Sequence, residues 1–206
     1  PRIEPRYAVK CFPDSQLIKA LSDQGCGFDC ASEKEARLAL DAGCPASRIV
    51  FANPCKLPSD IAFLHASGIA LTTFDCIDEL DKLMKTNCRV LLRIRADDSA
   101  SRLPFGAKYG CLEGEIAGLI EACAQRSINL CGVAFHVGSG ARSPKAFADA
   151  VALSKRVFDL YAKLRPHATP LDVLDVGGGF CGGFDDHGDA AVSASGDCTV
   201  VDALNQ

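Results

Sequence analysis

Short runs of β-branched and aromatic residues alternate along the whole chain with segments in which apolar residues recur at helical spacing. Strands are predicted at seven runs, residues 6–10, 27–29, 48–52, 70–74, 89–93, 130–136 and 173–176. Regular alternation of strands and helices is typical of a parallel sheet with crossover helices. No composition break marks a linker, so we expect one α/β domain over residues 1–206.

Helix boundaries support this alternation. Gly25 stands where a left-handed cap is expected after the first helix. Ser32 and Glu35 have the spacing of a capping box, and Ser143-Pro144 supplies an N-cap and a first-turn proline for a long helix. The chain starts at Pro1 and stops at Gln206 within a helical pattern, so both ends are expected to be cut.

Repeated β/α units of this length favour a (β/α)8 barrel or an open doubly wound sheet, between which periodicity alone cannot choose. Both folds place their chemistry at the carboxyl ends of the strands. Lys10, Asp29, Arg93, His136 and Gly177 each stand at the end of a predicted strand or directly after it. These positions are expected to form a site on one face.

Composition narrows the function. The 206 residues are 48% hydrophobic and carry a formal charge of -4, which is typical of a globular domain and lacks the basic patch of a nucleic-acid binder. No long apolar run or leader is visible, which favours a cytoplasmic protein without membrane contact. The 12 cysteines include no C-x-x-C pair, and the four histidines lack ligand spacing, so we expect structural thiols and no metal.

Lys10 follows the apolar run Tyr7-Ala8-Val9, where desolvation favours a Schiff-base lysine, although a surface lysine is an equally good explanation of the position alone. The run Gly177-Gly178-Gly179 after Asp175-Val176 could close backbone N–H groups around a phosphate. A flexible turn explains a triple glycine at least as well.

His136 begins the segment His136-Val137-Gly138-Ser139-Gly140, whose ring and hydroxyl suit a planar cofactor with a polar rim. Asp29 and Arg93 are charges at the ends of apolar strands, and such charges imply a partner or a ligand. The capping box already explains Glu35.

Six segments together resemble the ornithine decarboxylase family of pyridoxal-phosphate (PLP) enzymes, over nearly the whole chain. They are Tyr7-Ala8-Val9-Lys10-Cys11, Phe28-Asp29-Cys30-Ala31-Ser32, Ala52-Asn53-Pro54-Cys55-Lys56, Leu92-Arg93-Ile94, Phe135-His136-Val137-Gly138-Ser139-Gly140 and Leu174-Asp175-Val176-Gly177-Gly178-Gly179-Phe180. Their common order is more specific than any one of them. The resemblance implies an incomplete (β/α)8 barrel of the TIM type, with seven of eight strands and without the family's C-terminal β-domain.

The resemblance also assigns roles to individual residues. Lys10 would form the Schiff base and His136 would stack on the pyridine ring. The phosphate end of the cofactor would be held by Ser139, Gly177, Gly178 and Gly179. The same cavity would be lined by Asp29, Glu35 and Arg93. The implied reaction is decarboxylation of a basic amino acid, preferably ornithine to putrescine in polyamine biosynthesis, by a protein that forms a homodimer when complete.

Two departures qualify the resemblance. Phe12-Pro13 stands where the family has Asn after Lys-Cys, and the family's glutamate for the pyridinium nitrogen has no counterpart here, so the fragment is expected to be inactive alone. Two alternatives stay open. One is a non-catalytic relative of the antizyme inhibitors, which bind an antizyme-type regulator, and the other is a single-domain PLP-carrier protein.

Overall fold

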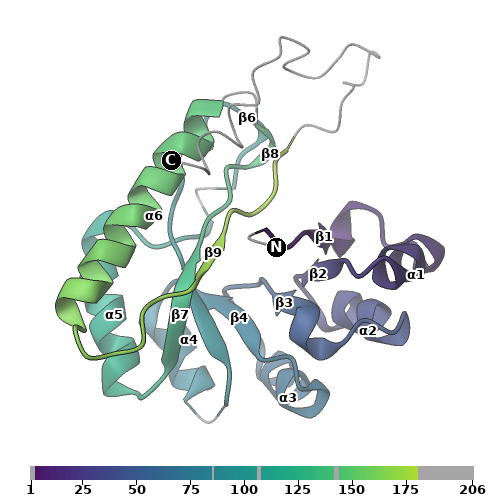
Figure 1. Cartoon of the computed structure of the whole chain (residues 1–206), viewed down its shortest axis with the longest axis horizontal. Coiled ribbons are helices and arrows are strands. Elements are labelled where there is room, and N and C mark those ends of the chain that lie inside the picture. The colour runs from purple at the N-terminus through teal and green to yellow at the C-terminus, as the bar shows by residue number, and fades with distance from the viewer. Residues whose placement is uncertain (1–2, 85, 106–107, 142–143, 181–206) are drawn as a thin grey trace. The chain divides into compact units, whose positions relative to one another are not determined.

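The computed structural model describes residues 3–84, 86–105, 108–141 and 144–180 (Figure 1). By internal contacts the chain divides into two compact units. The first unit comprises Pro1–Leu91 with Gly118–Cys131, and the second comprises Leu92–Ala117 with Gly132–Gln206. The single domain expected over residues 1–206 stays a prediction.

The main sheet has seven strands, paired in the order β1-β2-β3-β4-β5-β7-β9. Their bounds are β1 Arg6–Ala8, β2 Gly27–Cys30, β3 Ile49–Phe51, β4 Leu71–Phe74, β5 Arg89–Arg93, β7 Asn129–Ala134 and β9 Val173–Asp175. Within the first unit β1 to β4 pair in parallel, and β7 and β9 do so in the second. A doubly wound sheet reverses its strand order at a switch point, whereas a barrel adds each strand beside the previous one. The sequential order therefore confirms the barrel-type alternative.

All seven predicted strands are present, with ends that differ by at most two residues from the prediction. The prediction that Lys10 ends a strand is wrong, because β1 stops at Ala8 and Lys10 lies in the 3-10 turn η1, Val9–Cys11. Val9 is apolar because it turns into the core, where its exposed fraction is 0%, and not because the strand continues. His136 likewise lies beyond β7, which ends at Ala134.

In the first unit, helices cover the strands and close a core. Their bounds are α1 Ser15–Asp23, α2 Glu33–Asp41, α3 Pro58–Ser67, α4 Ile77–Leu83 and α5 Ile116–Gln125, with a 3-10 turn η2 at Ala46–Arg48. Helix α5 belongs to this unit from Gly118 onward. The Asp14 carboxylate caps α1 by accepting from the amides of Gln16 and Leu17, at 3.0 and 2.9 Å. Gly25 has a φ of 79°, which confirms the predicted left-handed position after α1. Figure 1 shows α1 and α2 beside strands β1 and β2.

In the second unit, helix α6 runs over Pro144–Leu164 and confirms the predicted first-turn proline, while Ser143 lies outside the described residues. A 3-10 turn, η3, spans Glu113–Glu115. The sequence did not predict the antiparallel pair of β6, Ser101–Leu103, with β8, Ser139–Ala141. No helix among the described residues combines the length and the apolar character needed to cross a bilayer.

Candidate cofactor site

Lys10 follows β1, and Asp29 lies within the neighbouring strand β2 of the first unit. Ala8, the last residue of β1, is in register with Asp29, the third residue of β2. The Tyr7 hydroxyl donates to the Phe12 carbonyl at 3.3 Å, across the turn that carries Lys10. The Lys10 side chain is exposed, and Asp29 is half-buried. The turn after β1 thus presents a primary amine to solvent, next to a strand that carries a carboxylate.

Glu35 has the structural task that its capping-box spacing predicts, with one difference. The Ser32 hydroxyl accepts from the Glu35 amide at 3.3 Å, as expected at the start of α2. The Glu35 carboxylate, however, accepts from the amide of Ala31 at 2.7 Å, not from the amide of Ser32. This bond ties Glu35 to the residue that directly follows β2.

Arg93 is the last residue of β5 and belongs to the second unit. Its guanidinium carbon lies 4.9 Å from the centre of the Tyr109 ring, a cation–π distance. Tyr109 had not been singled out by the sequence, because its position inside a loop gives no periodic pattern.

His136 is held within a close-packed loop of the second unit. Its Nδ1 accepts from the amide of Gly138 at 2.9 Å. Phe105 meets the imidazole edge-on, with ring centroids 5.3 Å apart and an interplanar angle of 76°. Phe105 too was missed by the sequence analysis, since only the folded loop brings it to the histidine.

The glycine run after β9 packs against the same loop, so the second unit brings these predicted residues together. Gly177 and Gly179 have φ angles of 64° and 97°. A Cβ on Gly177 would lie 2.3 Å from the Phe135 carbonyl oxygen, and one on Gly179 equally close to that of Gly138. A Cβ on Gly178 would lie 3.2 Å from Nε2 of His136. Only glycine fits at positions 177 and 179, and a glycine run beside an imidazole suits a ligand with a phosphate and an aromatic ring.

Ser139 is half-buried and begins β8, where it pairs with Leu103. This strand pairing fixes the backbone of Ser139. The amide of Ala141, at the end of β8, donates to the Gly179 carbonyl at 3.2 Å. Ser139 and the glycine run are therefore parts of one hydrogen-bonded arrangement.

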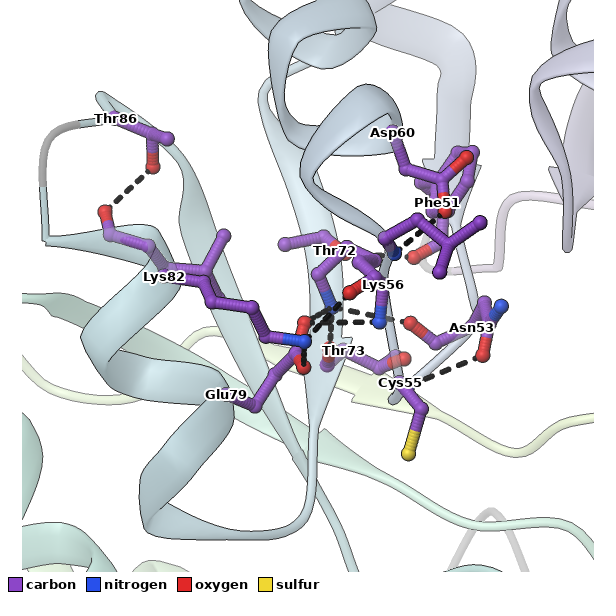
Figure 2. Close-up of polar contacts among 12 residues, drawn as sticks. Phe51, Asn53, Cys55, Lys56, Asp60, Thr72, Thr73, Glu79, Lys82 and Thr86 are labelled. Carbon is purple, nitrogen blue, oxygen red and sulfur yellow. Dashed lines mark hydrogen bonds and ion pairs between the residues drawn. The ribbon is translucent and has the colours of Figure 1, made fainter.

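A buried ion-pair network in the first unit had no predicted role (Figure 2). Lys56, in the loop after β3, donates from Nζ to the carbonyls of Asn53 and Thr73, at 3.0 and 2.7 Å, and lies 2.8 Å from Oε1 of Glu79. The Lys56 and Glu79 side chains are 0% and 1% exposed. Lys82 is the third member and pairs with the other carboxylate oxygen of Glu79. Burial lowers the pKa of Lys56, while the hydrogen bond and charge of Glu79 act in the opposite direction.

The thiols of the described residues fall into two groups. Cys11, Cys55 and Cys76 are exposed, whereas six others are buried and Cys26 is half-buried. Burial raises the pKa of the Cys123 thiol to about 12. Thiols buried in this way behave as small apolar groups, in keeping with the expectation from their scattered spacing.

The sequential order of the strands defines a barrel-type α/β domain. Comparison with known proteins gives the class. A family model described as the pyridoxal-binding domain of pyridoxal-dependent decarboxylases matches residues 1–203. The chloroplastic ornithine decarboxylase of Nicotiana glauca is 44% identical over 186 residues, which cover 89% of this chain and 42% of that protein.

Two further relatives show the range of the similarity. The crystal structure of the arginine decarboxylase of Paramecium bursaria Chlorella virus aligns with a TM-score of 0.89 and 37% identity, covering 100% of this chain and 54% of that one. Antizyme inhibitor 2 of Xenopus laevis is 39% identical over 184 residues, 88% of this chain and 40% of that protein. The chain thus spans about two fifths of the curated relatives it matches.

The chain belongs to the family of pyridoxal-dependent decarboxylases, of which it matches the pyridoxal-binding domain. The cofactor of this domain is therefore pyridoxal 5′-phosphate, as the sequence resemblance implied.

Proposed function

We propose that the chain is the cofactor-binding part of a decarboxylase of basic amino acids, with ornithine as the substrate and putrescine as the product. The preference for ornithine is supported by the 44% identity to an ornithine decarboxylase. Arginine is the competing substrate, since an arginine decarboxylase has a TM-score of 0.89. The substrate, a cytoplasmic location, a homodimer and a role in polyamine synthesis are all properties of the whole protein and belong to this proposal.

Within the chain we assign the roles as follows. Lys10 holds the cofactor covalently through its amine, and His136 stacks on the ring. The phosphate accepts hydrogen bonds from the hydroxyl of Ser139 and from the backbone of Gly177, Gly178 and Gly179. We also assign Asp29, Glu35 and Arg93 to cofactor binding, as the resemblance implies, and the Glu35 carboxylate already accepts from the Ala31 amide. When bound, PLP supplies an electron sink for the electrons released as a carboxylate leaves as CO2.

The observation that carries the proposal is the packing of the glycine run against His136. The positive φ angles of Gly177 and Gly179, with no room for a Cβ at either, bring the backbone of the glycine run close to an imidazole that accepts from the Gly138 amide. Anion-binding concavities are built from backbone N–H groups of this kind. Lys10, which belongs to the first unit, also supports the proposal, because it is an exposed amine that follows an apolar strand.

Reduction of the PLP complex with borohydride, followed by peptide mapping, tests the lysine assignment. The label is expected on Lys10 and is expected to disappear in Lys10→Arg. Lys19→Arg, at an exposed lysine of α1, is the matched control and should keep the label. A label that stays in Lys10→Arg would contradict the assignment.

The substrate is tested on the protein expressed from the complete reading frame. Release of labelled CO2 should be faster from ornithine than from lysine or arginine at equal concentration. Faster release from arginine would replace ornithine as the substrate and leave the reaction class intact.

A regulator without activity is the second candidate, supported by the 39% identity to an antizyme inhibitor. The enzyme is favoured because Lys10, Asp29, Arg93, His136 and the glycine run are all present in the sequence. No CO2 release from any basic amino acid, together with binding to an antizyme-type protein, would favour the regulator.

A further inference from the structure

The imidazole of His136 has neighbours on three sides, all from its own unit. The Gly138 amide donates to Nδ1 at 2.9 Å, and the Phe105 ring lies edge-on at 5.3 Å between centroids. On the third side lies the backbone of Gly178, where an added Cβ would be 3.2 Å from Nε2 of His136. A ring constrained in this way has one preferred plane.

The bond from Gly138 also fixes the protonation pattern of the neutral ring. An imidazole nitrogen that accepts a hydrogen bond carries no proton, and the other nitrogen of the neutral ring then carries it. Nδ1 accepts here, so the neutral form of His136 has its proton on Nε2.

Phe105 is itself held by the buried side chain of Asp98, which lies at the start of a turn. The carboxylate of Asp98, which is 9% exposed, accepts from the Phe105 amide. The Asp98 carbonyl accepts from the amide and the hydroxyl of Ser101, at 3.0 and 2.7 Å. This turn also touches the histidine loop, since a Cβ on Gly138 would lie 2.2 Å from the Ser101 hydroxyl oxygen.

We propose that Phe105 is a positioning residue, which sets the plane of the His136 ring and keeps its neutral form protonated on Nε2. The Phe105 ring lies at an interplanar angle of 76° to the imidazole, so a rotation of the imidazole away from the Gly138 amide changes this edge-on contact. The consequence for the cofactor rests on the proposed function, because it requires His136 to stack on PLP. The consequence for the ring itself does not.

The first test needs no cofactor. In protein labelled with 15N-histidine, with His136 assigned by its loss in His136→Asn, NMR should show an unprotonated Nδ1 and a protonated Nε2 at a pH where the ring is neutral. Phe105→Leu should shift the His136 ring resonances and mix the two tautomers, whereas Phe105→Tyr, which keeps the ring edge, should preserve the pattern. A proton on Nδ1 in the unaltered protein, or unchanged His136 resonances in Phe105→Leu, would overturn the proposal.

The second test is a double-mutant cycle on PLP affinity, with Phe105→Leu, His136→Asn and the double variant. An edge-on aromatic contact is worth about a 2- to 10-fold change in an equilibrium constant, so Phe105→Leu should weaken PLP binding by about that factor. It should cause no further loss in the His136→Asn background if it acts through the imidazole. Phe63→Leu, a buried ring of the first unit, is the control and should leave the affinity unchanged.

The outcomes separate the two claims. Equal losses from Phe105→Leu in both backgrounds would mean that Phe105 does not act through His136. An unchanged affinity in His136→Asn would refute the stacking role under the proposed function, and the NMR pattern would then still decide the positioning role. If Phe105→Leu does not fold, as a thermal melt would show, Phe105→Met takes its place in both tests.

Discussion

Replacing Lys56 with Met should destabilise the chain by about 3 kcal/mol, because it leaves Glu79 buried without its main partner. The Lys56 ammonium has three acceptors, which are the carbonyls of Asn53 and Thr73 and the Glu79 carboxylate, all within 3.0 Å. Met retains most of the aliphatic stem, so the loss is one of charge and hydrogen bonds and creates no large cavity.

The magnitude follows from what remains around Glu79. Removing one partner of a buried ion pair typically costs about 3 to 5 kcal/mol. Lys82 still pairs with Glu79 and is 34% exposed, so the remaining charge is partly compensated and the lower end of the range applies. For a chain of this size, about 3 kcal/mol corresponds to a decrease in Tm of roughly 6 to 12 °C.

Two variants serve as controls. Lys19→Met removes an exposed pair with Asp23, whose side chains are 57% and 56% exposed, and should cost less than about 0.5 kcal/mol. The double variant Lys56→Met/Glu79→Leu removes the whole buried pair and should regain most of the lost stability, because well-packed apolar replacements of buried pairs are often neutral.

Urea unfolding of each variant, followed by circular dichroism, measures these differences at constant m-value. A loss in Lys56→Met no larger than that in Lys19→Met would refute the reasoning, since the network would then contribute no more than a surface pair. A double variant less stable than Lys56→Met would show that the hydrogen bond that Glu79 accepts from the backbone amide at position 56, together with its pair with Lys82, outweighs the cost of the charge left on Glu79.

Three further outcomes are expected. Gly179→Ala should abolish tight PLP binding, because φ is 97° and the added Cβ has no room. The control Gly118→Ala has no atom within 4 Å of the added Cβ and should stabilise the chain by about 0.5 to 1 kcal/mol. PLP titration measures the first effect and thermal melts measure the second. His136→Ala should weaken PLP binding more than Glu35→Ala, which mainly removes a helix-start contact worth about 1 kcal/mol, and equal affinities would contradict ring stacking. Cys123, with its pKa raised to about 12, should be alkylated at neutral pH only after unfolding, unlike the exposed cysteines, as timed mass spectrometry would show.

The strands could be predicted from the sequence because each is a short apolar run between turn residues, and parallel strands are buried on both faces. Their ends could not. Val9 continues the apolar run of β1, but it is buried from within a 3-10 turn, and a single buried apolar residue looks the same in either conformation. The pair β6 and β8 was missed because each has three residues and exists only through its partner.

The residues of the candidate site also fall into two groups, those that the local sequence shows and those that only the fold shows. Lys10, His136 and the glycine run are recognisable locally, as an amine, a ring and flexible backbone after apolar strands. Phe105 is not, because its role comes from a contact with a residue far along the chain. Glu79 is harder still, since it stands in Ile77-Asp78-Glu79-Leu80, where a carboxylate in the first turn of a helix is normally solvated. Only the folded network shows that it is buried.

The same network predicts how stability changes with pH. Burial lowers the pKa of Lys56 from its ordinary value of 10.5, more than Glu79 raises it. Between the lowered pKa and 10.5 the unfolded chain therefore binds more protons at this lysine than the folded chain does, so the free energy of unfolding rises with pH in that window and levels off above it. Because Lys56→Met has no such group, the stability difference between the unaltered protein and the variant should widen as the pH increases toward 10.5. Urea unfolding at several pH values measures the difference directly. A difference that narrows with pH would mean that the folded state raises the pKa of Lys56, and that its attraction to Glu79 outweighs the loss of hydration.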